Sequence, residues 1–179
     1  MMSFVQASLA QRSRAELPAV VKLVGLDLAL PVLEGLHFDP TGGSGHQPYD
    51  FGWQHQRGKF SLLYEVIPQR GDTMLAPHAR AGVRVVHNAR NSEGDFIGRF
   101  RGGSEDLRRL GADWAYFWDY APKAALGEWR RCYQASYYRA GQGMVNAFLL
   151  YNDEEYLHSD WVYVLPFIEP AIRPATIDH

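Results

Sequence analysis

The chain has 179 residues, a formal net charge of −2 and a hydrophobic content of 46%. This length and composition predict one globular domain that buries a core without the help of disulfides or a metal. The balanced charge and the scattered basic residues argue against a nucleic-acid-binding protein, since such proteins usually carry a basic excess along one surface.

Neither membrane insertion nor secretion is expected from this sequence. No apolar run approaches the roughly 18 residues of a membrane span. Residues 1–10 lack the basic segment and the long apolar core of a signal peptide. The single Cys132 cannot form an internal disulfide, which favours a reducing compartment. A cytoplasmic location follows by elimination, and Cys132 itself is expected to be a small strand residue rather than a nucleophile.

The N-terminal half of the chain predicts an arm, short strands and a hairpin. Residues 1–17 are polar and weakly patterned, and we expect a flexible arm before the single domain at 18–170. From 20 to 31 the β-branched content and the Gly and Pro breaks favour short strands over one helix. Two period-two runs at 49–56 and 59–67 predict a hairpin that turns at Arg57 and Gly58.

The middle of the chain carries the signals of helices. Pro77 suits a first helical turn, so a helix over 77–89 is expected, with Val83 and Val86 in its apolar stripe. Ser104 and the two acidic residues after it predict the start of a second, short helix that ends near Gly111.

Strand patterns dominate the remainder. Runs at 129–138, 144–151 and 160–168 alternate at period two, and the acidic segment between the last two predicts a short helix over 153–158. Residues 171–179 are expected to form a tail. The predicted fold class is therefore α+β, with a mainly antiparallel sheet of about six strands and helices packed on its faces.

The residues of this sequence do not have the spacing that the motifs of common active sites require. The glycine-rich segment 42–45 lacks the Lys and Ser or Thr that a phosphate-binding loop requires. It is no nucleophile elbow either, because His46 stands where the second glycine would follow Ser44. The seven histidines include no pair at the spacing of a metal site. We therefore predict no catalytic residues, no metal site and no cofactor.

Aromatic residues in the segment 114–120 give the sharpest functional signal. On a strand, one face would carry Trp114, Tyr116, Trp118 and Tyr120, and the other Ala115, Phe117 and Asp119. An exposed face of rings is typical of an interaction site. The alternative is that helices cover both faces and the rings belong to the core. On the first interpretation, the predicted binding residues are Trp114, Trp118 and Tyr120, with Lys123 as a polar residue at the rim.

Asp113 and Asp119 lie among these rings and complete the predicted binding site. Burial there would raise a carboxyl pKa, so this is the one place where a catalytic acid could be tuned. The favoured alternative is that each aspartate caps a backbone group or pairs with an arginine.

The order of elements, together with the segments 111–114 and 122–123, resembles the Mog1/PsbP-like α/β/α sandwich group. The resemblance spans residues 20–168 and rests on pattern and order. It implies a binding or assembly-accessory role with no shared enzyme activity, and it assigns no binding residue to a position in this chain. The expected absence of a secretion signal departs from the exported members.

A non-enzymatic binding or assembly-accessory protein is the function that these observations favour. Its partner would be another protein or a second copy of the chain, met through the aromatic sheet face. The alternative is a small enzyme or small-molecule binder with Asp113 or Asp119 in an aromatic pocket. A flat surface of rings would support the first hypothesis, and a closed pocket with a carboxylate at its base the second.

Overall fold

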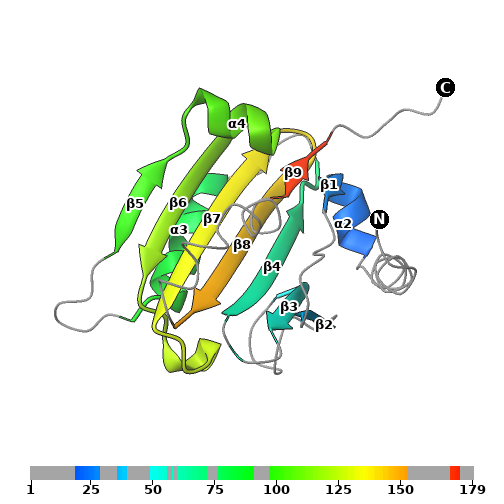
Figure 1. Cartoon of the computed structure of the whole chain (residues 1–179). Coiled ribbons are helices and arrows are strands. Elements are labelled where there is room, and N and C mark those ends of the chain that lie inside the picture. Colours follow the sequence, from blue (N-terminus) through cyan, green and yellow to red (C-terminus); the bar gives the residue numbers. More distant parts are fainter. Residues whose placement is uncertain are drawn as a thin grey trace.

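A computed structural model of the chain describes residues 19–28, 36–39, 49–55, 58, 60–71, 76–90, 97–152 and 170–173. These residues form an α+β fold with a seven-stranded sheet and a two-stranded sheet (Figure 1). Every strand pair is antiparallel. In sheet order, the strands of the large sheet are β2 (Leu36–Asp39), β3 (Phe51–His55), β4 (Phe60–Pro68), β8 (Gly143–Tyr151), β7 (Arg131–Arg139), β6 (Trp114–Tyr120) and β5 (Gly98–Arg101). The predicted fold class, α+β with a mainly antiparallel sheet, is confirmed.

Most of the predicted strands that fall within the described residues are found. β3 and β4 form the predicted hairpin, with Trp53 opposite Leu62. The runs at 129–138 and 144–151 correspond to β7 and β8, the central pair of the sheet. The predicted arm at 1–17, helix at 153–158 and strand at 160–168 lie outside the described residues.

The prediction of short strands alone between 20 and 31 is wrong, because a helix comes first. α2 covers Ala19–Val24, and Val21 and Val24, three residues apart, are its buried side chains. Burial of this one face outweighs the preference of valine for strands. Gly25 then ends the helix at φ +67°, and β1 (Leu26–Asp27) pairs with β9 (Ala171–Ile172), which lies where the predicted tail begins.

The first predicted helix of the middle region is confirmed as α3 (Pro77–Asn88), but its predicted apolar stripe is wrong. Val83 and Val86 are 68% and 64% exposed, whereas Ala81 and Val85 are buried. Ala81 packs in the same cluster as the large rings of the sheet. A small side chain at this position leaves room for those rings, and this packing selects the face that the helix buries.

The second predicted helix is confirmed as α4 (Ser104–Leu110), with one correction at its start. The N-cap residue is Gly103 rather than Ser104. Asp106 Oδ2 accepts a hydrogen bond from Gly103 N at 3.0 Å and so satisfies a donor of the first turn. Gly111 ends the helix in the left-handed conformation at φ 62°, as predicted.

Different elements cover the two faces of the large sheet. One face packs against α2, α4 and the β1–β9 pair, through residues such as Val24, Leu110 and Ile172. The other face packs against α3, through Ala81 and Val85. Figure 1 shows α3 behind the sheet, β9 in front of it, and α2 on the side of β4. Among the described residues, no helix is long and apolar enough to cross a membrane.

Candidate binding surface

β6 divides the aromatic run between the two faces of the sheet as the period-two pattern predicts. Trp118 and Tyr120 belong to the apolar cluster under α3, and Trp114 and Tyr116 pack at its margin. Phe117 belongs to the cluster on the opposite face. The alternation follows from strand geometry alone, because successive side chains of a strand point to opposite faces.

Trp118 and Tyr120 are core residues. Trp118 is 5% exposed and Tyr120 is 0% exposed. They share their cluster with Val85 of α3 and with Leu126 of the 3-10 helix Ala124–Leu126, which follows β6. The expectation of an exposed ring face therefore does not hold for these two residues. The alternative, in which helices cover both faces of the sheet and the rings belong to the core, agrees with the burial of these two residues under α3.

Rings remain half-buried where the aromatic run begins. The ring centroids of Trp114 and Tyr116 are 5.7 Å apart, and those of Trp114 and Tyr138 are 6.2 Å apart. The guanidinium carbon of Arg99, an exposed residue of β5, lies 4.3 Å from the Tyr116 ring centroid. This distance is that of a cation–π contact. We call Trp114, Tyr116, Tyr138 and Arg99 the ring surface.

Hydrogen bonds to Gln69 hold one ring of the ring surface in place, and the Trp114 indole N–H of this surface has no bonding partner among the described residues. Tyr138 donates a hydrogen bond from its hydroxyl to Gln69 Oε1 at 2.9 Å, and Gly141 N donates to the same oxygen. The indole nitrogen of Trp114 has no hydrogen-bond partner among the residues that the structure describes. Tyr138 and Arg99 were not predicted as part of this surface, because only the register places Tyr138 opposite Trp114 and β5 beside β6.

Asp113 caps a backbone group and Asp119 pairs with an arginine, which are the two structural roles expected for them. Asp113 Oδ2 accepts a hydrogen bond from Ala140 N at 2.7 Å and so caps the turn between β7 and β8. Asp119 forms an ion pair with Arg131 on the neighbouring strand, with about a third of each side chain exposed. The two aspartates lie at opposite ends of β6, so they do not converge on one site.

Lys123 caps a helix instead of bordering a ring patch. Its Nζ donates hydrogen bonds to His87 O at 2.8 Å and to Val86 O at 3.3 Å. These carbonyls lie in the last turn of α3, where a cation is favoured by the helix dipole and by the unsatisfied carbonyl groups. The predicted role of Lys123 at the rim has no support in these contacts.

A row of buried polar side chains that was not predicted from the sequence runs across the sheet face under α3. Ser136 Oγ donates to Asn146 Oδ1 at 2.5 Å, and Gln134 Nε2 donates to Ser136 Oγ at 2.9 Å. Tyr120 donates to Gln134 Oε1 at 2.8 Å, and all four residues are at most 1% exposed. Asn146 Nδ2 donates to Glu65 at the other end of the row. One signal was available: Asn146 interrupts an otherwise apolar run in β8.

The polar groups of this row are hydrogen-bonded to one another and are poorly suited to catalysis. Burial raises the pKa of Tyr120 well above its ordinary value. Cys132, on the neighbouring strand, is fully buried, and burial raises the pKa of its thiol to about 12. A neutral buried thiol is unreactive, since the thiolate is the nucleophile. Cys132 lies on β7, and its burial agrees with the prediction of a small strand residue rather than a nucleophile.

Neither a metal-binding cluster among the described residues nor a match to a known family points to a ligand of this surface. Within the described part of the chain, no cluster of three or more histidine, cysteine or acidic residues is arranged to hold a metal ion. Comparison with models of protein families gives no match, and comparison with curated proteins gives none either.

Proposed function

We propose that this protein is a non-enzymatic binding or assembly-accessory protein that meets a protein partner through the ring surface. The observation that supports this proposal is the group of half-buried rings, Trp114, Tyr116 and Tyr138, beside the exposed Arg99. Trp, Tyr and Arg are the residue types that most often anchor protein interfaces.

The packing of the rings supports binding at low entropic cost. Tyr138 is held by Gln69, and Tyr116 lies between Trp114 and Trp118, with ring centroids 5.7 Å from each. Side chains that are already ordered lose little freedom when a partner covers them. A partner that buries these rings also reaches Arg99, whose charge favours an acidic neighbour.

The bonds of the two aspartates favour this proposal over the enzyme alternative. A catalytic acid needs a carboxyl group that can reach a substrate. Asp113 holds the Ala140 amide, and Asp119 is paired with Arg131.

We also propose that the chain belongs to the Mog1/PsbP-like group. This placement is supported by the order of the elements, in which the β3–β4 hairpin precedes α3 and α4, and β6, β7 and β8 follow. The accessory role that this resemblance implies agrees with the proposed function.

The test compares partner capture by matched variants. The purified chain, Tyr116→Ala and the control Val83→Ala, which changes an exposed residue of α3, would capture proteins from the native source. Each captured candidate would then be purified and its Kd measured. We expect Tyr116→Ala to weaken binding about tenfold or more, as loss of an aromatic anchor does. We expect Val83→Ala to bind as the wild type does.

A captured protein that binds Tyr116→Ala and the wild type equally would contradict the proposal. Circular dichroism and the melting temperature of each variant separate lost binding from lost folding. Because Tyr116 is only half-buried, Tyr116→Ala is expected to remain folded at the assay temperature.

A further inference from the structure

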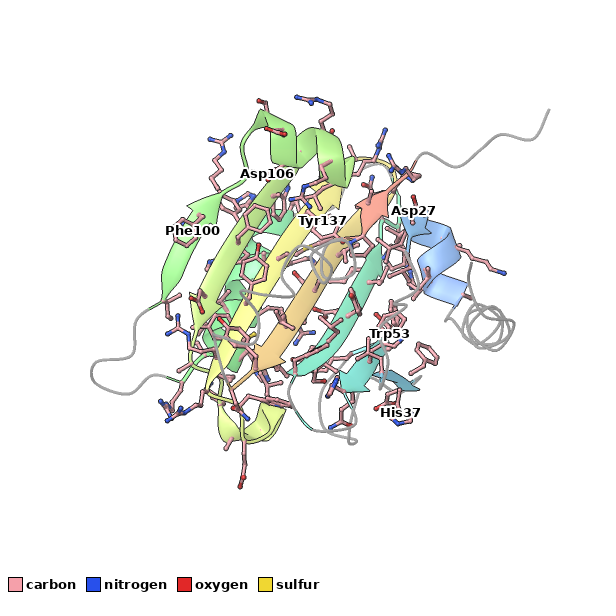
Figure 2. All side chains as sticks on the ribbon, viewed as in Figure 1. Asp27, His37, Trp53, Phe100, Asp106 and Tyr137 are labelled. Carbon is pink, nitrogen blue, oxygen red and sulfur yellow. The ribbon has the colours of Figure 1, made fainter. Side chains whose placement is uncertain are left out.

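β5 is the last strand on one side of the large sheet. The sheet order ends at β5, which pairs with β6 and with no other strand that the structure describes. Figure 2 shows Phe100 of this strand at the margin of the molecule, far from Tyr137 in the sheet interior. An unpaired edge of this kind is a template for another extended chain.

The alternation of main-chain hydrogen bonds between β5 and β6 shows which main-chain groups face this free edge. Gly102 N donates to Ala115 O at 3.0 Å, which makes Gly102 and Ala115 a hydrogen-bonded pair with β6. Such pairs alternate along antiparallel strands, so Phe100 also bonds inward to its partner Phe117. The N–H and C=O groups of Arg99 and Arg101 therefore point to the open side.

The side chains of β5 sort into two faces with different chemistry. Arg99 and Arg101 lie opposite Trp118 and Tyr116, on the face of the ring surface, and both arginines are exposed. Phe100 is on the other face and is 63% exposed. A chain added to this edge would meet two cations on one face and an aromatic ring on the other.

A second copy of this chain does not suit the edge. If two β5 strands paired antiparallel through their outward-facing groups with full overlap, Arg99 of each copy would lie opposite Arg101 of the other. Like charges directly opposite each other destabilise a strand pair, and edge charges are a common barrier to self-association. The same charges favour a different chain that carries acidic residues.

We propose that the β5 edge binds an extended acidic segment of a partner protein, which adds antiparallel as an eighth strand of the sheet. The segment carries an acidic residue opposite each of Arg99 and Arg101, and an apolar residue between them that packs on Phe100. This inference rests on the proposed binding function and names the chemistry of the partner. Main-chain bonds supply affinity in such strand addition, and side chains at alternate positions supply specificity.

The test uses the full chain and a labelled synthetic peptide, Ser-Thr-Glu-Val-Glu-Thr-Ser, with binding followed by fluorescence anisotropy. Three control peptides keep the same side chains: one with the order Val-Glu-Glu, one with N-methyl groups on both glutamates, and one with an N-methyl group on the central valine. The glutamate N–H groups donate to the carbonyls of Arg99 and Arg101, so their methylation should abolish binding. N-methylation of the central valine, whose N–H points away, should leave binding unchanged.

Charge reversal gives an independent measurement. Arg99→Glu with Arg101→Glu should weaken binding of the glutamate peptide about tenfold or more, and a peptide with lysine at both positions should then bind the double variant instead. The variant positions are exposed, so circular dichroism should show an unchanged fold.

Three results would overturn the inference. They are no binding of the glutamate peptide at millimolar concentration, equal binding of the peptide methylated on both glutamates, and a wild-type dimer in sedimentation that Arg101→Pro dissolves. The first and second leave the capture test of the ring surface untouched, so failure here is distinguishable from failure of the proposed function. If a captured protein bound Tyr116→Ala and the wild type equally while the glutamate peptide still bound, the ring-surface proposal would fail and the β5 proposal would not.

Discussion

Asn146 donates a hydrogen bond from Nδ2 to Glu65 Oε2, 2.8 Å away, across the β4–β8 pair. Both side chains are buried on the sheet face that α3 covers. Arg84 of α3 binds the same carboxylate, with its Nε 2.7 Å from Glu65 Oε2. The polar row of the sheet is thereby joined to the helix, and a helix in another position would leave a buried carboxylate without its cation.

Arg84→Met should destabilise the protein, because it leaves the Glu65 carboxylate buried without a cation. Loss of one partner of a buried pair destabilises by several kcal/mol, and partial exposure of Arg84 lowers the expectation to about 2–3 kcal/mol. Urea unfolding measures this difference. The control Arg80→Met, at an exposed position of the same helix, should change the unfolding free energy by less than ~0.5 kcal/mol. Equal stability of the two variants would show that the pair does not hold α3.

Trp118→Ala should behave as a core truncation. The side chain is 5% exposed, so its removal leaves a cavity and is expected to lower the unfolding free energy by ~3–5 kcal/mol. Phe100→Ser, at a 63% exposed ring, should lower it by less than ~1 kcal/mol. Both are measured by thermal and urea unfolding. A Trp118→Ala protein with wild-type stability would return this ring to the candidate binding surface.

Cys132 should be inert in the folded protein. Its pKa of about 12 means that only roughly one thiol in ten thousand is ionised at pH 8, and the side chain is fully buried. A chromogenic disulfide reagent should therefore report no thiol in the native protein and one per chain in concentrated urea. Rapid reaction of the native protein would indicate that β7 opens toward solvent.

Asp50→Asn should change how stability depends on pH. Burial raises the pKa of Asp50 above its ordinary value of 3.8, and the hydrogen bond from Val66 N only partly opposes this. The fold therefore favours the protonated form. This contribution is complete below the ordinary pKa and is lost as pH rises through the raised one. An asparagine is always neutral and can still accept the Val66 bond.

The variant should thus gain stability relative to the wild type as pH rises from about 4 to 7. Unfolding free energies at both pH values measure the gain. A difference between the two proteins that is equal at pH 4 and pH 7 would show that Asp50 titrates alike in the folded and unfolded chain.

Local chemical signals made several elements predictable. Pro77 begins α3 at the predicted residue, and Gly111 ends α4, because each residue acts on its own backbone. β7 and β8 were recognisable because a half-buried strand imposes a period of two on its side chains.

Other elements depended on contacts that the sequence order does not show. The valines of α2 prefer strands, yet the helix forms because Val21 and Val24 together reach the sheet core. Val83 and Val86 fit an apolar stripe as well as Ala81 and Val85 do, and only contact with the sheet decided which pair was buried.

The sequence by itself determined that Trp114, Tyr116, Trp118 and Tyr120 share one face of β6, because the pleat of a strand repeats every two residues. Only the tertiary structure decided that α3 and its neighbours bury Trp118 and Tyr120, while Trp114 and Tyr116 remain half-buried beside Tyr138 and Arg99. The physical reason is that exposure depends on what packs against a side chain. For these rings, the position of α3 is tied to the Glu65–Arg84 pair, whose two residues lie 19 positions apart in the chain.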